Sequence, residues 1–267
     1  GHLFTETNPV RNRRTYTPTL AIENFGLTNN DLETTFNAGE ILGLGSTTLT
    51  NIIKHLEEIY CDSIGVEYMY IRTPEVLKWW QDKLNVNDNH PTYSVETKKY
   101  LLSKLNQAVT FESFLQTKYV GQKRFSLEGG ESLIPAISVA LYNASNDYDV
   151  PECVLGMAHR GRLSTLVNVF RKPLHELFSE FEGKYHLGNT IDKTYRNGKK
   201  IKMNLVPNPS HLETVASVVE GITRAKIDKD YNGDDSKILP IIVHGDAAIA
   251  GQGIAYEVAQ MSQLNGY

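Results

Sequence analysis

The sequence predicts an α/β protein in which a mostly parallel sheet carries helices on both faces and follows a mainly helical N-terminal segment. After Tyr119, short apolar runs alternate with stretches of helical spacing, which is typical of a parallel sheet covered by helices. Before it, apolar residues recur mostly at helical spacing, after an opening stretch that prolines and glycines interrupt up to Gly45. We therefore divide the 267 residues into a helical segment, residues 1–118, and an α/β domain, residues 119–267.

The N-terminal segment contains three predicted helices. Ser46 or Thr47 is available as the N-cap of the first, and a proline in the first turn opens the second. Trp79 and Trp80 of the second helix are interpreted as core residues without a chemical role. The three helices are expected over Leu49–Tyr60, from Pro74 onwards, and over Thr97–Lys118.

The α/β domain contains three runs that predict buried strands, each followed by polar residues. In a parallel sheet the carboxyl ends of the strands share one edge, and ligands bind beyond it. We therefore expect the polar residues after the strands to form one site. The strands are expected over residues 153–157, 201–206 and 238–243, and the helices over residues 131–141, 163–170 and 212–226.

Composition excludes several classes of protein. A net charge of -4, from 27 Lys+Arg and 31 Asp+Glu, gives no field that attracts nucleic acid. The basic run Arg11–Arg14 lacks an aromatic stacking platform. Cys61 and Cys153 match no metal spacing and suit a reducing compartment. No apolar run reaches the roughly 18 residues of a membrane helix and no signal peptide opens the chain, so we expect a soluble protein of the bacterial cytoplasm or the mitochondrial matrix.

Asp246 is the most informative residue. It follows the apolar run Ile238–Val243 and a glycine, and small residues surround it. Capping of the next helix is one interpretation. Coordination of Mg²⁺ fits better, because Mg²⁺ combines one or two carboxylates with phosphate oxygens, and a helix N-terminus favours phosphate. The sequence therefore predicts a metal-bound diphosphate at this strand end.

Two other strand ends carry candidate ligands. His159 and Arg160 follow the first strand, where a permanently charged guanidinium suits phosphate or carboxylate; a lone histidine there is more often a cap or a core group. Ser210 and Glu213 after the second strand form a capping box, which is compatible with anion binding. His186 adds a second imidazole on a loop of the same sheet.

Five segments, taken in order, resemble the thiamine-diphosphate-dependent 2-oxoglutarate dehydrogenase family, the decarboxylating first component of the 2-oxoglutarate dehydrogenase complex. Three further stretches, Gly1–Leu3, Asn8–Arg11 and Gly65–Met69, are also similar to this family. The resemblance covers essentially the whole chain, which looks like an N-terminal fragment. The five segments are Lys123–Glu131, Gly156–Leu163, Tyr185–Gly188, Asn208–Glu213 and His244–Gly253.

The resemblance implies a thiamine-diphosphate-binding fold, with residues 119–267 as its diphosphate-binding domain. It implies attack of the cofactor's ylid on 2-oxoglutarate, loss of CO₂, and transfer of the succinyl group to a lipoyl-bearing succinyltransferase in the tricarboxylic acid cycle. It also implies a homodimer. The residues carried over are His159 and His186 around the 2-oxo acid; Arg160, Ser210, Leu212, Asp246, Ala247 and Ala248 at the cofactor; and Asp246 as the Mg²⁺ ligand.

Two departures from the family pattern qualify this implication. The family completes its metal site with an Asn-Asn pair, and the residues between Asp246 and Tyr267 contain none; the pyrimidine-binding domain with its activating glutamate is absent too. We therefore expect incomplete coverage and an isolated chain without turnover. The stretch Phe181–Tyr185 is also shorter than the family's usual glycine-rich segment.

Three alternatives stay open. A 2-oxoadipate dehydrogenase would share the same motifs, and relative rates on the two acids would separate them. A non-catalytic fragment that binds only cofactor or partners is a second alternative. A nucleotide-binding α/β protein is the third, although no Gly-x-Gly-x-x-Gly or Walker loop follows a strand here.

Overall fold

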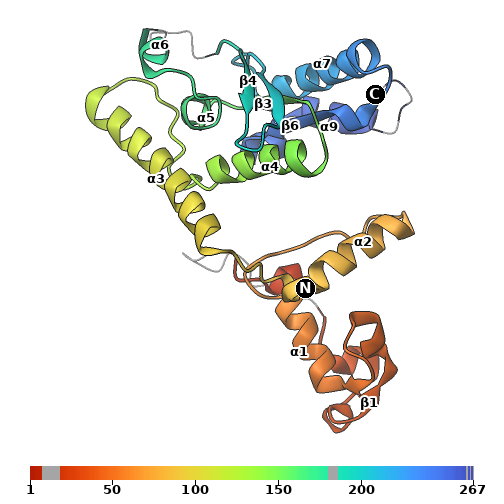
Figure 1. The fold of residues 1–267 in the computed structure, drawn as a ribbon. Coiled ribbons are helices and arrows are strands. Elements are labelled where there is room, and N and C mark those ends of the chain that lie inside the picture. Colours follow the sequence, from red (N-terminus) through yellow and green to blue (C-terminus); the bar gives the residue numbers. More distant parts are fainter. Residues whose placement is uncertain (8–18, 180–185, 263, 265, 267) are drawn as a thin grey trace. The chain divides into compact units, whose positions relative to one another are not determined.

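The computed structural model describes residues 1–7, 19–179, 186–262, 264 and 266. The basic run Arg11–Arg14, the stretch Asn8–Arg11 and the short segment Phe181–Tyr185 lie outside these residues. Within them, no helix is both long enough and apolar enough to cross a membrane. Figure 1 labels most of the helices and strands.

The chain forms two compact units, Gly1–Ser94 and Val95–Tyr267. The division precedes the long helix α3, Val95–Lys118, whereas the change in sequence character suggested one after it. Ala108, Phe111 and Leu115 of α3 are buried in the same core as the strands of the second unit. This apolar stripe explains why the helix belongs to the α/β unit.

The first unit is built on two helices with short turns around them. The N-cap of α1 is Thr48, whose hydroxyl accepts from the amide of Asn51, so the expected caps Ser46 and Thr47 were wrong by one or two positions. Trp79 and Trp80 are 49% and 36% exposed, so their interpretation as core residues was also wrong. The elements are α1 Leu49–Tyr60, α2 Pro74–Asn85, the antiparallel pair β1 Thr35–Phe36 and β2 Thr47–Thr48, and 3₁₀ turns at His2–Phe4, Ile22–Phe25, Asn29–Asp31, Asn37–Leu42 and Val86–Asn89.

The second unit contains a four-stranded sheet of order β4-β5-β3-β6. Strands β5 (Lys200–Leu205) and β6 (Ile238–Val243) run parallel to the central strand β3 (Glu152–Met157) on either side of it. Strand β4 (Asn189–Thr194) pairs antiparallel with β5. The predicted α/β class with a mostly parallel sheet is therefore confirmed, and β4 makes the sheet mixed.

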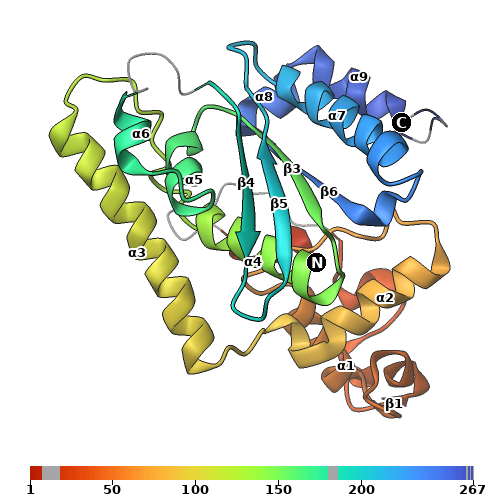
Figure 2. The ribbon, with the colours of Figure 1, turned by 45° about the horizontal axis from the view of Figure 1, so that its top comes forward.

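Helices cover both faces of this sheet (Figure 2). Cys153, Leu155 and Met157 of β3 pack into the core that α3, α4 and α5 share, while Val154 packs with α7 on the opposite face. Gly156 allows the close approach of α7, because a Cβ there would lie 2.4 Å from Val219 Cγ2. The helices are α4 Leu133–Asp147, α5 Arg162–Asn168, α6 Leu174–Ser179, α7 Thr214–Asp230, α8 Asp246–Gly251 and α9 Gly253–Met261.

Candidate active site

The loop before α4 and the turn after β3 are locked together. The amide of Gly161 donates to the carbonyl of Phe125 at 3.0 Å, and the Phe125 ring lies against the His159 ring at 5.1 Å between centroids. Gly161 has a φ of +78, and a Cβ on it would lie 2.6 Å from Leu127 Cδ1. Only glycine fits this contact easily, which fixes where His159 leaves β3.

His159 and His186 form a pair at the carboxyl end of the sheet. Their ring centroids are 4.8 Å apart and the rings are nearly perpendicular, at 84°. One ring follows β3 and the other precedes β4, so residues distant in sequence meet at one strand edge. The structure thus brings together the two histidines that the resemblance places around the 2-oxo acid.

Asn208 lies between the two histidines and is buried. Its main-chain carbonyl lies 2.8 Å from His186 Nδ1 and its Oδ1 lies 3.0 Å from the same atom. Its Nδ2 lies 3.1 Å from His159 Nδ1 and 3.3 Å from the carbonyl of Met157. A single asparagine therefore contacts both rings and the end of β3.

Arg162 joins the segment after His186 to the end of β5. Its side chain is fully buried, and its Nη2 donates to the carbonyls of Leu187 at 2.9 Å and Val206 at 2.8 Å. Burial lowers the pKa of Arg162 to about 10, so the guanidinium is still charged at neutral pH. The charge binds the loop of His186 to the end of β5.

The environment of His159 favours its neutral form. Burial lowers the pKa of His159, and the neighbouring His186 and Arg162 lower it further. A neutral imidazole offers one donor and one acceptor nitrogen, so His159 can both accept from Asn208 and donate elsewhere.

Asp246 occupies the first position of α8, directly after the end of β6. The N-cap is Gly245, with no side-chain capping bond, so the structure does not support the capping interpretation. The side chain is exposed, and across the described ranges no hydrogen bond or ion pair reaches its carboxylate. The oxygens of this carboxylate can therefore accept hydrogen bonds from water or bind a ligand.

Glu213 anchors the turn that carries Asp246. Its buried carboxylate accepts from His244 Nδ1 through Oε2 and from the amide of Gly245 through Oε1 at 3.3 Å. Helix α7 begins at Thr214, and Glu213 precedes it with a φ of +67 and no side-chain capping bond. The predicted capping box of Ser210 and Glu213 was therefore wrong, because the glutamate turns toward β6 instead of back toward Ser210.

The remaining predicted cofactor residues lie near these turns without forming a polar network. Arg160 is exposed, and its Nη1 lies 3.4 Å from the carbonyl of Ser126. Ser210, Leu212 and Ala247 are exposed, and Ala248 is half-buried. No polar contact joins any of these to Asp246 within the described parts of the chain. A cavity of about 20 Å³ is lined by His159, Asn208, Leu212 and Glu213 among others, which is room for about one water.

Sequence reasoning missed Asn208, Arg162 and Glu213 as organisers of the site. Each lies within a segment already singled out, but was assigned no role or a local one. Asn208 did carry a signal, because Pro207 and Pro209 on either side of it have no amide hydrogen. Because the two prolines donate no main-chain hydrogen bonds, the polar side chain between them can bond to neighbouring loops.

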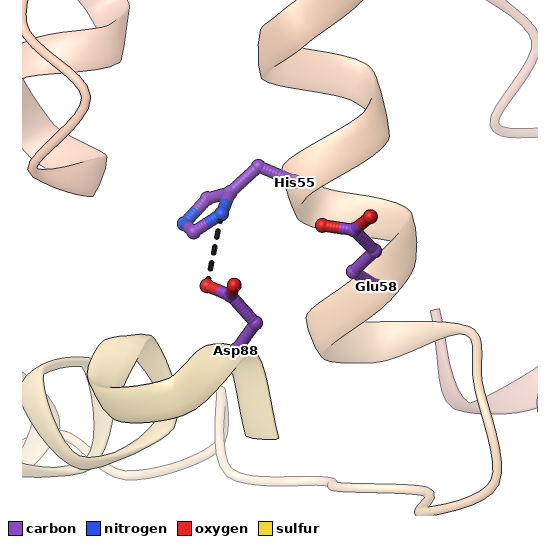
Figure 3. Close-up of side chains that lie close together, drawn as sticks. All are labelled: His55, Glu58 and Asp88. Atoms are coloured by element: carbon purple, nitrogen blue, oxygen red, sulfur yellow. Dashed lines mark ion pairs between the residues drawn. The ribbon is translucent and has the colours of Figure 1, made fainter. Parts of the chain in front are cut away.

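One further group of side chains in the described part of the chain has ligand atoms close enough for a metal ion: His55, Glu58 and Asp88. Figure 3 shows His55 and Glu58 on one helix and Asp88 opposite them. His55 Nδ1 lies 3.2 Å from Asp88 Oδ1, and Asn89 Nδ2 donates to the carbonyl of Ile59 at 2.9 Å. These contacts fasten the turn to α1, which accounts for the cluster without an ion.

Comparison with known proteins identifies the family. The family model of the dehydrogenase E1 component matches residues 103–267. The chain belongs to the dehydrogenase E1 component family. The 2-oxoglutarate dehydrogenase E1 component of Azotobacter vinelandii is 42% identical over 280 residues, which cover 100% of this chain and 30% of that protein.

Two further relatives support the same family assignment. The multifunctional 2-oxoglutarate metabolism enzyme of Mycolicibacterium vanbaalenii is 42% identical, and the 2-oxoglutarate dehydrogenase E1/E2 component of Corynebacterium glutamicum is 43% identical. Each match covers 100% of the chain and 23% of the relative. The chain therefore spans less than a third of the length of these relatives. The resemblance that the five segments predicted is confirmed.

Proposed function

We propose that this chain contributes the diphosphate-binding part of an active site that decarboxylates 2-oxoglutarate with thiamine diphosphate and Mg²⁺. One observation carries the proposal. The paired histidines His159 and His186 lie at the same sheet edge as the turn that bears Asp246, whose carboxylate has no protein partner within the described residues. The proposal concerns a protein of the relatives' length. Residues 1–267 alone are expected to show no turnover.

The donor set at the end of β6 fits a metal-bound diphosphate. Asp246 has an exposed carboxylate without a protein partner across the described ranges, and Mg²⁺ takes one or two carboxylates together with phosphate oxygens. Ala247 and Ala248 are small enough for the diphosphate to approach the chain. Arg160, Ser210 and Leu212 would complete the cofactor's surroundings. Thiamine diphosphate supplies the electron sink for the loss of CO₂ when it is bound.

The histidines would bind and orient the substrate. A 2-oxo diacid carries two carboxylates, and imidazole N–H groups donate hydrogen bonds to carboxylate oxygens. Burial and the neighbouring His186 and Arg162 lower the pKa of His159, which favours a neutral ring that can donate a hydrogen bond without carrying a charge. His186, 4.8 Å away between centroids, would assist proton transfer.

The names of the relatives guide the proposal about partners. Two of them are E1 or E1/E2 components of 2-oxoglutarate dehydrogenase. For this protein we propose transfer of the succinyl group to a lipoyl-bearing succinyltransferase, a homodimeric state, and a place in the bacterial cytoplasm or mitochondrial matrix. A preference for 2-oxoadipate is the competing specificity, and relative kcat/KM values on the two acids decide between them.

Asp246→Asn tests the proposal in the complete protein. Titration calorimetry with thiamine diphosphate and Mg²⁺ is expected to show at least a roughly tenfold weaker binding in the variant, because one charged metal ligand is lost. Asp235→Asn is the matched control: it is an exposed aspartate just before β6, at the opposite end of the same strand. Equal binding by wild type and Asp246→Asn would overturn the assignment. A rate of 2-oxoglutarate decarboxylation that thiamine diphosphate does not change would overturn the reaction.

A further inference from the structure

Asn208 touches both histidines with chemically different groups. Toward His186 it presents oxygen atoms, and toward His159 it presents its amide nitrogen. Because Asn208 is buried, bulk water has poor access to replace either contact. The two rings therefore meet opposite halves of one side chain.

The contact with His186 fixes the proton on one of its nitrogens. His186 Nδ1 lies 2.8 Å from the main-chain carbonyl of Asn208 and 3.0 Å from its Oδ1. Carbonyl oxygens only accept hydrogen bonds, so Nδ1 must carry the hydrogen. A neutral His186 then has its lone pair on Nε2.

The contact with His159 fixes the opposite arrangement. The orientation of the Asn208 amide is set by Met157, whose carbonyl lies 3.3 Å from Nδ2 and can only accept. The same Nδ2 lies 3.1 Å from His159 Nδ1. An amide nitrogen only donates, so His159 Nδ1 accepts and a neutral His159 carries its hydrogen on Nε2.

We propose that Asn208 is a positioning residue that holds His159 and His186 in opposite tautomers, His159 with a proton on Nε2 and His186 with a lone pair on Nε2. When both rings are neutral, the pair offers one hydrogen-bond donor and one proton acceptor of fixed identity. The lowered pKa of His159, caused by burial and by neighbouring His186 and Arg162, agrees with a neutral ring.

The assignment gives each histidine a distinct task and rests on the proposed function only for the identity of the substrate. His159 would donate from Nε2 to an oxygen of the 2-oxo acid. His186 would take up a proton at Nε2 and release it from there. Two histidines in the same tautomer could not divide donation and acceptance in this way without a proton exchange first.

Nitrogen-15 solid-state NMR on histidine-labelled complete protein reads the tautomers directly, because protonated and unprotonated ring nitrogens resonate far apart. His159→Gln and His186→Gln assign the two rings among the eight histidines of residues 1–267. In wild type, above neutral pH, Nδ1 is expected unprotonated in His159 and protonated in His186. The same tautomer in both rings would overturn the proposal.

Asn208→Asp tests whether the amide is the cause. A carboxylate only accepts, so His159 Nδ1 is expected to gain a hydrogen, either by a tautomer switch or as the imidazolium. His186 should stay protonated at Nδ1, because the main-chain carbonyl at 2.8 Å remains. An unchanged His159 signal in folded Asn208→Asp protein would contradict the proposal.

Asn204→Leu is the matched control for Asn208→Leu. Asn204 lies on β5, shortly before Asn208, and its side-chain amide is also hydrogen-bonded. Its Nδ2 donates to Glu152 and its Oδ1 accepts from Thr190, so neither group contacts the histidine rings. Both variants lose side-chain hydrogen bonds, and only Asn208→Leu is expected to release the His159 tautomer. Matching changes of the His159 signal in both variants would show a general structural effect and overturn the specific role.

Activity separates this inference from the proposed function. Asn208→Asp is expected to lower kcat/KM for 2-oxoglutarate by roughly tenfold or more, with binding of thiamine diphosphate and Mg²⁺ unchanged. If wild-type protein shows the opposite tautomers but no decarboxylation, the proposed function fails while the tautomer assignment stands. If it decarboxylates with both rings in one tautomer, the assignment fails alone.

Discussion

Strand β3 carries a polar cluster at each end, and the two clusters are built differently. At its start, the buried carboxylate of Glu152 accepts from Asn204 Nδ2 at 2.5 Å and Tyr231 Oη at 2.8 Å, and it pairs with Lys226 Nζ at 2.9 Å. Both oxygens are used. Beyond the end of the strand, His159 shares one asparagine with His186.

The difference separates an end of the strand that stabilises the fold from an end that is proposed to bind ligands. A closed network satisfies every buried group and stabilises the sheet. At the other end, the rings of His159 and His186 are oriented through one shared asparagine, and the carboxylate of Asp246 has no hydrogen bond or ion pair within the described residues. That exposed carboxylate remains available to a ligand.

Arg162 gives the largest expected effect. It does not fit the division between the two ends of β3, because it lies at the proposed ligand-binding end and yet stabilises the fold. Arg162→Met is expected to lower the free energy of unfolding by about 3 kcal/mol, since buried carbonyls lose a charged donor. Urea unfolding measures the loss. Arg224→Met, which removes an exposed pair with Asp228, should cost about 0.5 kcal/mol or less. Equal losses would show that Arg162 does not hold the loop.

Gly156 tests whether α7 must approach β3 closely for the strand end to form. Gly156→Ala is expected to destabilise by about 2 kcal/mol through overpacking, because its Cβ would lie 2.4 Å from Val219 Cγ2. In contrast, Gly221→Ala in α7 has open space around its Cβ and should stabilise by about 0.5 kcal/mol or more. Thermal unfolding in which both variants shift in the same direction would contradict this packing argument.

Glu152 tests the comparison between the two ends of β3 through the dependence of stability on pH. Burial by itself raises the pKa of Glu152, but hydrogen bonds from Lys226, Tyr231 and Asn204 outweigh it and the pKa is lowered. The ionised group therefore stabilises the fold above its ordinary pKa of about 4.3, and this contribution is lost as the pH falls through the lowered pKa.

Glu152→Gln is expected to cost about 1–2 kcal/mol at pH 7 and to weaken the dependence of stability on pH below about 5. Denaturant titrations at a series of pH values measure both. The exposed Glu176→Gln on α6 is the control and should follow wild type. A Glu152→Gln curve parallel to that of wild type would mean that the carboxylate does not carry the acid sensitivity.

Asp246 gives the smallest expected change of stability. Asp246→Asn should alter the free energy of unfolding by less than about 0.5 kcal/mol without ligand, because the side chain is exposed and unbonded within the described ranges. Under the proposed function, thiamine diphosphate with Mg²⁺ is expected to stabilise wild type, and the same variant should lose this stabilisation. A large loss without ligand would place Asp246 among the structural residues.

The sequence predicted the parallel strands well and the antiparallel strand β4 not at all. Buried parallel strands are continuous apolar runs, so β3 and β6 were recognised to within a residue. Strand β4 alternates in burial and reads as a polar loop. The Asn197-Gly198 pair, which turns the chain between β4 and β5 with a Gly198 φ of +83, is the hairpin signal that could have found it.

The organisation of the site depends on contacts that no local pattern contains. His159, His186 and Asp246 were named from their place after strands and from resemblance. The role of Asn208 needs the carbonyl of Met157 and two rings from other loops. Glu213 looked like a helix cap because its spacing from Ser210 fits one, yet its partner is His244 on the next strand's turn.

The order of strands along the chain sets when each part of the site can first form during synthesis. Strand β3 is synthesised before both of its neighbours, and its last partner, β6, is the final strand of the described sheet. The histidine pair can form once β5 is in place, but Asp246 arrives only when β6 pairs. Until then β3 presents an unpaired apolar edge, the kind of surface that aggregates in folding intermediates. The proposed diphosphate ligand would therefore bind only chains in which β6 has paired with β3, and its binding would report that pairing.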